Sequence, residues 1–275
     1  MRILPPRVPK PTKTVAIVVP MHNRPQLLPE EEVSLRHLIH YLGKYDKYLL
    51  VPETPNARYH GFGIKRFSKK FFGSTDAYRR LMLTAQFYDT FREYKYILIY
   101  HLDALVFSDQ LMEWCETDLD YIGPPFISCA DSPWVKVERV GNGGLSLRKI
   151  DTFLKTIYSS RYYMEPNEYW RKYCASKPRV VQYLNLPRKY LKRLGMANCA
   201  QWHMSHWTRN EDLFWSDMAV KYNPEFKIAS LDTGLRFAFE AAPRLCFERN
   251  NFRLPFGCHG WPRYDRDFWD PFLLK

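Results

Sequence analysis

The sequence predicts an α/β fold with a mostly parallel central sheet, flanked by helices and carrying a basic, aromatic-rich insert. Three observations support this class. Short, continuous apolar runs end in polar loops, amphipathic segments separate these runs, and 275 residues with 46% hydrophobic content suit one large domain or two small ones. An unbroken apolar run is typical of a strand that is buried on both faces. Strands that alternate with helices favour a parallel sheet.

Four segments are predicted to be strands. The first reads TVAIVVP, is rich in Val and Ile, and runs directly into a polar loop. The fourth reads YILIY and is followed at once by His101-Leu102-Asp103. In open α/β sheets, ligands bind beyond the carboxyl ends of the strands, so these two loops are the first places to look for a site. The predicted strands are 14–20, 48–51, 64–67 and 96–100.

Helices are predicted between these strands and after them. In 30–42 the residues Leu35, Leu38 and Leu42 share one stripe, and acidic residues at the start suit the helix dipole. A second helix is expected over 77–91, with residues 74–76 as its cap. An apolar and aromatic helix is expected over 213–222.

Composition excludes several classes of protein. The chain has 41 Lys+Arg against 29 Asp+Glu, a net charge of +12, and is 16% aromatic. A chain this apolar can bury a core, and its apolar runs are far shorter than the roughly 20 residues that span a bilayer. Residues 1–13 read as a Pro-rich segment without the apolar core of a secretion signal, and we expect 14–275 to form a single domain. Six scattered Cys without a C-x-x-C pair favour free thiols and a cytoplasmic setting.

Much of the positive charge lies in 151–210. This insert holds 11 Lys+Arg and 3 Asp+Glu, together with 11 aromatic residues. Interleaved basic and aromatic residues occur in proteins that bind nucleic acids, polyanions, anionic lipids or stacked sugars, and also in solvated inserts with a small core. No known nucleic-acid-binding module appears in the sequence.

Asp103 is the most informative single residue. It lies two positions after His101, and in an extended segment both side chains point to the same side. Together they can hold a divalent cation at the end of a strand. A carboxylate in such apolar surroundings needs a cation, a metal ion or N–H donors, although a structural Asp that caps a turn would also satisfy this need.

Three other stretches carry candidate site residues. Residues 141–144 (GNGG) allow close approach of the backbone to a ligand, or form a plain turn before a strand. Glu211 and Asp212 precede an apolar helix and suit either a catalytic base or a first-turn acid. His259 lies in the loop PFGCHGW, where it is either structural or a ligand, and no second Cys/His pair at zinc spacing accompanies it.

The order of these motifs resembles that of GT-A type glycosyltransferases, and of a little-characterised bacterial family assigned to them. VAIVVPMHNRP resembles their donor-nucleotide loop, and YILIYHLDALVF resembles their D-x-D element. The segments VGNGGLSL, RNEDLFW and FGCHGW follow in the matching order, so the resemblance covers most of 14–261. One departure is that His101 replaces the first acid of D-x-D. The fold that the resemblance implies is GT-A-like (Rossmann-like).

The resemblance also implies roles for individual residues. The activity would be transfer of a sugar from a nucleotide-diphosphate donor, most often a UDP-sugar in this class, to an acceptor hydroxyl, with inversion favoured. Asp212, or else Glu211, would be the base. A divalent metal ion, Mn²⁺ or Mg²⁺, would bind at Asp103, His101 and His259. The donor-binding residues would be His22, Asn23, Arg24, Asp76, Asp103, Asn142, Gly143 and Gly144.

The basic insert would form the acceptor side of such an enzyme. Its aromatic residues suit sugar stacking, and its cations suit an anionic glycan or a lipid-linked acceptor. This reading allows peripheral contact at the inner face of the membrane, and a role in polysaccharide biosynthesis without a nucleic-acid partner. The acceptor-side residues would be Trp202, Trp207, Arg188, Lys189, Lys192 and Arg193. The alternatives are a glycoside hydrolase, which needs two carboxylates across the scissile bond, and a non-enzymatic protein that binds polyanions or nucleic acids.

Overall fold

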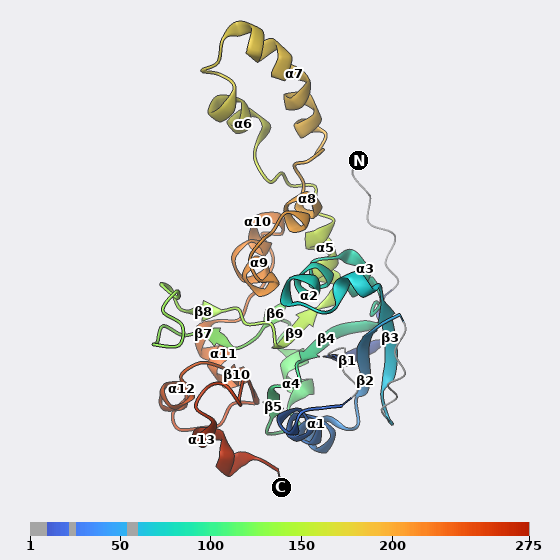
Figure 1. Cartoon of the computed structure of the whole chain (residues 1–275), viewed down its shortest axis with the longest axis vertical. Coiled ribbons are helices and arrows are strands. Elements are labelled where there is room, and N and C mark those ends of the chain that lie inside the picture. Colours follow the sequence, from blue (N-terminus) through green and yellow to red (C-terminus); the bar gives the residue numbers. More distant parts are fainter. Residues whose placement is uncertain (1–9, 22–25, 54–59, 275) are drawn as a thin grey trace.

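A six-stranded sheet forms the centre of the molecule (Figure 1). The computed structural model describes residues 10–21, 26–53 and 60–274. The strand order is β3-β2-β1-β4-β9-β6; the first four strands are parallel, and β9 is antiparallel to both of its neighbours. This arrangement confirms the predicted α/β class. The strands are β1 (Lys13–Pro20), β2 (Asp46–Pro52), β3 (Gly63–Phe67), β4 (Tyr94–Tyr100), β6 (Tyr121–Ile122) and β9 (Leu145–Lys149).

All four predicted strands are present in the sheet. Two of them, β1 and β4, bury apolar side chains on both faces of the sheet. In β1, Ala16 and Val18 pack into one apolar cluster, whereas Ile17 and Val19 pack into the other. β4 divides its side chains between the same two clusters. Since alternate residues of a strand point to opposite faces, an unbroken apolar run fits a sheet that is covered on both sides.

Helices cover both faces of this sheet. Helices α2, α3 and α5 pack on one face through Leu81, Phe87 and Phe153, respectively. Helices α1 and α4 pack on the other face through Leu38 and Leu111. These two layers bury the core. The elements are α1 (Pro29–Leu42), η1 (Lys69–Phe71), α2 (Thr75–Met82), α3 (Ala85–Asp89), α4 (Leu111–Glu116) and α5 (Ile150–Ile157).

Two predicted helices are each divided in the structure. The single helix expected over 77–91 is wrong, because α2 ends at Met82 and the Thr84 side chain caps α3 by accepting a hydrogen bond from the backbone of Phe87 at 3.3 Å. The expected cap at Ser74 is confirmed, since its hydroxyl accepts from Ala77 N at 3.1 Å. The helix expected over 213–222 is divided into α9 (Glu211–Asp217) and α10 (Ala219–Tyr222).

The C-terminal part adds short strands and helices beside the main sheet. β5 (Ala104–Val106) pairs antiparallel with β11 (Gly257–His259), and β11 pairs parallel with β10 (Ala238–Phe239). In this register His259 lies opposite Ala104, next to the end of β4. The remaining elements are β7 (Pro125–Phe126), β8 (Arg139–Val140), α11 (Leu231–Phe237), α12 (Pro243–Arg249), α13 (Arg266–Trp269) and η2 (Asp270–Phe272).

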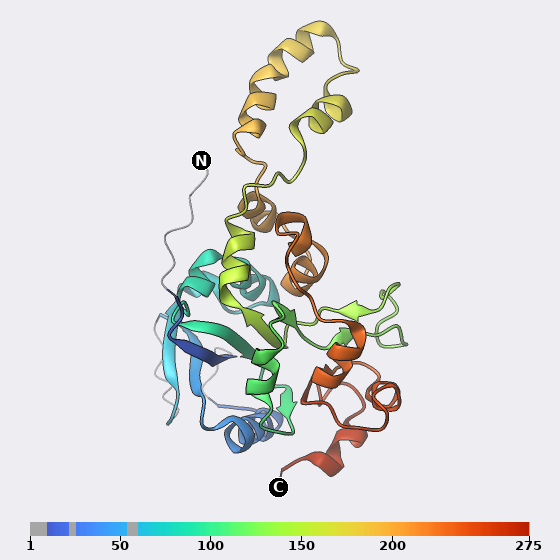
Figure 2. The same cartoon turned by 180° about the vertical axis from the view of Figure 1, so that it is seen from behind.

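The basic segment 151–210 has three structurally different parts. α5 is a core helix, because Phe153 and Ile157 are buried against the sheet. α6 (Pro166–Tyr173) and α7 (Arg179–Arg193) then project away from the body in both views (Figures 1 and 2). α8 (Ala200–Ser205) returns to the core. We call residues 166–196 the helical arm.

Phe153 offers a test of the core beneath the arm. It is fully buried, and its ring lies 4.2 Å from that of Trp215 and 4.9 Å from that of Tyr88. We expect Phe153→Ala to lower the free energy of unfolding by about 3–5 kcal/mol, because it removes buried surface and leaves a cavity. Phe252→Ala, at a site that is 70% exposed, is the matched control and should change it little. Chemical denaturation measures both, and equal effects would contradict this packing.

Candidate functional site

A cleft of about 1340 Å³ opens beyond the carboxyl ends of β1 and β4. Pro20 and Met21 line it at the end of β1, and residues 101–103 line it after β4. Residues 142–144 precede β9, and because β9 runs antiparallel to β4 they reach the same edge of the sheet. This is the position at which α/β sheets bind ligands.

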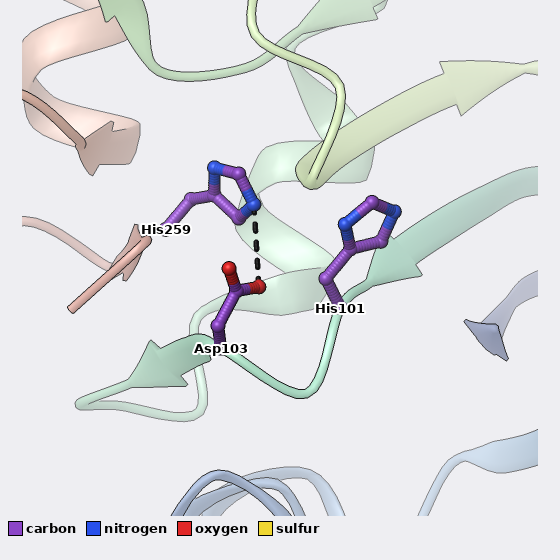
Figure 3. Close-up of side chains that lie close together, drawn as sticks. All are labelled: His101, Asp103 and His259. Atoms are coloured by element: carbon purple, nitrogen blue, oxygen red, sulfur yellow. Dashed lines mark ion pairs between the residues drawn. The ribbon is translucent and has the colours of Figure 1, made fainter. Parts of the chain in front are cut away.

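His101, Asp103 and His259 converge in this cleft. Figure 3 shows the three side chains close together, two from the turn after β4 and one from β11. His259 Nε2 lies 3.3 Å from Asp103 Oδ1, and one ligand-type atom from each residue lies within 4.8 Å of the other two. A carboxylate and two imidazoles at this spacing could hold a metal ion.

The turn at residues 142–144 forms the side of the cleft next to this cluster. The backbone N–H of His101 donates to the carbonyl of Gly144 at 2.8 Å, and His101 Nε2 lies 3.0 Å from the hydroxyl of Tyr78. A Cβ atom on Gly144 would lie 2.0 Å from His259 Nε2. Only glycine therefore leaves room for the imidazole at this position, and this explains one of the glycines that the sequence singled out.

Glu240 is a member of the site that the sequence did not reveal. Its Oε1 accepts a hydrogen bond from Asn142 Nδ2 at 2.6 Å and lies 2.9 Å from His259 Nδ1. The residue follows β10, a two-residue strand that leaves no pattern in the sequence. A carboxylate behind a histidine is the arrangement that orients imidazole ligands in metal sites.

Electrostatic attraction between the carboxylates of Asp103 and Glu240 and the imidazole of His259 stabilises this cluster. Burial disfavours the protonated form of His259, but Asp103 and Glu240 outweigh this effect and raise the pKa of His259 to about 10. Burial likewise opposes ionisation of Asp103, but His259 and His101 outweigh it and hold the pKa of this carboxyl well below its usual range. The cluster therefore holds a carboxylate beside a cation, and a proton and a metal ion would compete for the same position.

Glu211 and Asp212 lie at the start of α9 and also line the cleft. Both are buried, and Glu211 Oε1 lies 3.4 Å from the guanidinium of Arg148, which is fully buried. Asp212 Oδ1 accepts a hydrogen bond from the backbone of Leu213 at 2.7 Å. The buried arginine thus anchors Glu211, while Asp212 has no ion pair among the described residues.

Burial dominates the ionisation of Asp212, although the residue lies in the first turn of a helix. Burial, followed by the charge of Glu211, raises the pKa of Asp212 to about 8. The backbone N–H of Leu213 and the charge of Arg148 act in the opposite direction and are outweighed. A carboxyl group with a pKa near neutrality is suited to general acid–base chemistry.

The structure brings together part of the donor-binding set predicted from the sequence. Asn142, Gly143 and Gly144 line the cleft. Asp76 is not part of the described lining: it lies on the exposed side of α2, where its carboxylate pairs with Arg79 and Arg80. The predicted donor residues His22, Asn23 and Arg24 lie outside the described residues.

None of the six predicted acceptor-side residues is among the described residues that line the cleft. Trp207 packs against Phe214, and its Nε1 donates to the carbonyl of Asn210 at 2.9 Å. Trp202 stacks on His206. The four cations lie on α7 in the helical arm, and they are Arg188, Lys189, Lys192 and Arg193. Two other arginines line the cleft instead, Arg209 and Arg263.

Asp212 should make stability depend on pH. Its folded pKa lies above the unfolded value of 3.8, so its stabilising contribution is complete below about pH 4 and is lost as pH rises through about 8. We expect Asp212→Asn to be more stable than the wild type at pH 8, with a melting-temperature difference that grows by about 5 °C between pH 5 and pH 8. Asp232→Asn, at an exposed position, is the control. A difference that is the same at both pH values would refute the assignment.

Comparisons with solved structures find glycosyltransferases. GlyE of Streptococcus pneumoniae TIGR4 has 14% identity over 95% of this chain, with a TM-score of 0.43, and this chain spans 60% of the length of that structure. A glycosyltransferase involved in glycosylation of the major capsid of PBCV-1 has 9% identity, covering 90% of this chain and 93% of that chain, with a TM-score of 0.43. Mouse xyloside xylosyltransferase 1 has 12% identity, covering 90% and 97%, with a TM-score of 0.42. At these identities and TM-scores the likeness identifies no activity.

Comparisons by sequence give one family. No curated protein matches the chain. The family described as "Protein of unknown function (DUF5672)" matches residues 61–259, a span that runs from β3 to β11 and includes His101, Asp103 and Asp212. Because this match covers more than half of the sequence, the chain belongs to the DUF5672 family.

Proposed function

We propose that the protein is a GT-A-like glycosyltransferase that moves a sugar from a nucleotide-diphosphate donor to the hydroxyl of a glycan or lipid-linked acceptor. The observation that carries this proposal is one cleft, at the carboxyl ends of parallel strands, that holds both a potential metal cluster and a buried carboxyl pair. The order of motifs in the sequence supports the same reaction. A UDP-sugar is the donor that we favour.

The donor diphosphate would lie against His101, Asp103 and His259. The chemistry of this ligand set suits Mn²⁺ better than Mg²⁺, because two of the three ligands are imidazoles and Mg²⁺ prefers oxygen. A bound divalent cation would neutralise the charge that develops on the leaving diphosphate. Arg209 and Arg263 also line the cleft and supply positive charge from the protein itself.

Asp212 is the proposed base. Because Arg148 lies beside Glu211, the latter is held in place as an ion-pair partner, and Asp212 is left to accept the proton of the acceptor hydroxyl. A base that acts directly on the attacking hydroxyl favours inversion at the anomeric carbon. Because the pKa of Asp212 is about 8, a fraction of the molecules carries an ionised Asp212 at neutral pH.

The donor sugar would lie over the turn at residues 142–144. Gly143 has no side chain, and a Cβ atom there would lie 2.8 Å from both the Glu211 Oε1 and an Arg148 nitrogen, so the backbone closely approaches the carboxyl pair. Asn142 is held by Glu240 at one end of this turn.

Replacing the proposed base should affect sugar transfer without affecting donor binding. We expect Asp212→Asn to reduce sugar transfer by about 100-fold or more and to leave the affinity for the donor nearly unchanged, because the amide cannot take the proton. A panel of nucleotide sugars measures transfer, and calorimetry measures donor binding. Asp232→Asn is the matched control and should keep both.

Three results would count against this proposal. Full activity of Asp212→Asn would exclude Asp212 as the base. Failure of the wild type to bind or turn over any nucleotide sugar, with or without Mn²⁺, would exclude the transferase function. Release of free sugar from a glycan without any nucleotide would favour a glycoside hydrolase instead.

Metal binding can be tested without turnover. We expect the wild type to bind Mn²⁺, detected by calorimetry or by the loss of the free-ion electron paramagnetic resonance signal, and Asp103→Asn and His259→Ala to abolish it. Glu240→Gln should weaken it by about 10- to 100-fold, since Glu240 orients His259. His206→Ala is the histidine control. Equal Mn²⁺ binding by all variants would place the metal elsewhere.

A further inference from the structure

Helix α7 of the helical arm packs with its polar side toward α6. The Lys189 Nζ lies 5.3 Å from the ring of Trp170, and the Lys192 Nζ lies 4.7 Å from the ring of Tyr169, both on α6. Aliphatic stems of lysine cover aromatic surface well, and the ammonium group is attracted to the ring faces. Cations and aromatic rings, instead of an apolar stripe, therefore join the two helices of the arm.

The opposite side of α7 is apolar and exposed. Val180, Leu184 and Leu191 are separated by four and seven positions, which places them on one stripe of a helix, and they are 70%, 73% and 42% exposed. Tyr183 and Tyr190 border this stripe and are 70% and 59% exposed. None of the residues of α7 is buried. A helix with its apolar stripe turned outward needs a partner for that stripe.

The charge of the helical arm indicates the chemistry of the partner. The helical arm holds eight Lys+Arg and one Glu, a net charge of +7. Arg179, Arg188 and Arg193 are exposed on α7. Two copies of the arm would repel each other when packed face to face, and the chain as a whole carries +12. An anionic partner with an apolar interior complements both features.

We propose that the helical arm docks onto an anionic lipid bilayer, with α7 lying in the plane of the membrane surface. The 15 residues of α7 extend about 22 Å, and among the described residues no helix is long and apolar enough to cross a bilayer. A short helix with an apolar face, interfacial tyrosines and flanking cations is suited to the boundary between headgroups and acyl chains. This proposal does not depend on the sugar-transfer reaction.

The arm is placed to make such a contact. It projects from the body in both views, beyond α8, and its two helices lie at one end of the long axis (Figures 1 and 2). Its outward stripe can therefore meet a flat surface without displacing the core. Exposed cations near an anionic membrane each strengthen binding and make it sensitive to salt.

Vesicle co-sedimentation of the full chain tests this proposal. The probes are vesicles of phosphatidylcholine alone and vesicles of phosphatidylcholine with 30% phosphatidylglycerol. We expect binding to the anionic vesicles that weakens as salt rises. The triple variant Val180→Ser, Leu184→Ser and Leu191→Ser should lower the partition coefficient by about tenfold or more, and so should Arg179→Gln with Arg188→Gln and Arg193→Gln.

Matched controls change the same number of exposed apolar or basic residues outside the arm. They are Val137→Ser with Val220→Ser and Phe252→Ser for the apolar stripe, and Lys69→Gln with Lys136→Gln and Arg253→Gln for the cations. Both control variants should bind vesicles like the wild type. Melting temperatures show whether each variant is folded, and since the changed residues are exposed we expect them to match the wild type within a few degrees.

Several outcomes would overturn the proposal. These are no binding by the wild type to anionic vesicles, equal binding to neutral and anionic vesicles, or an equal loss of binding in arm and control variants. A wild-type dimer in solution that becomes a monomer in the Val180, Leu184 and Leu191 variant would assign the stripe to a second copy of the chain. Donor binding and Mn²⁺ binding should be unchanged in every arm variant, so failure here is separate from failure of the proposed function.

Discussion

The antiparallel pairing of β5 with β11 is the contact on which the site depends. It places His259 opposite Ala104 and so beside Asp103, although the two residues are far apart in the sequence. β10 pairs with the other edge of β11 and delivers Glu240 to the far side of the same imidazole. A few backbone hydrogen bonds in very short strands thus bring the residues of the cluster together at the end of β4.

Arg148 has a comparable role for the other half of the cleft. Its guanidinium is fully buried and contacts the hydroxyl of Tyr88, the hydroxyl of Ser146 and the carboxylate of Glu211. Removing one partner of such a buried pair leaves an uncompensated charge, which is costly in free energy. The carboxyl pair, the turn before β9 and helix α3 are therefore coupled through one side chain of the central sheet.

The sequence was sufficient to predict those elements that are determined by their own residues. β1 and β4 are unbroken apolar runs because both faces are covered, and Ser74 caps α2 with its own hydroxyl. Sequence reasoning also named His101, Asp103 and His259, and the structure brings all three together. Their roles in binding and catalysis stay predictions.

The rest depends on contacts between distant segments. Glu240 and Arg148 become part of the site only through pairing of short strands and through burial, neither of which has a periodic signature. The single helix expected over 77–91 failed because a local hydrogen bond at Thr84 competes with helix continuation. The raised pKa of Asp212 likewise depends on burial and on the neighbouring charge of Glu211, and burial has no local sequence signal. In α7, the apolar stripe that normally marks the inner side of a helix faces outward.

The construction of the helical arm has a consequence for local stability. Because α7 buries none of its residues, few of its backbone hydrogen bonds are shielded by a packed interior. The amides of the arm should exchange with solvent through local openings of low free energy, whereas those of β1 and β4 should exchange only when the whole domain unfolds. The arm can then change its conformation without disturbing the cleft, and a partner that orders it contributes stability that the isolated chain does not have.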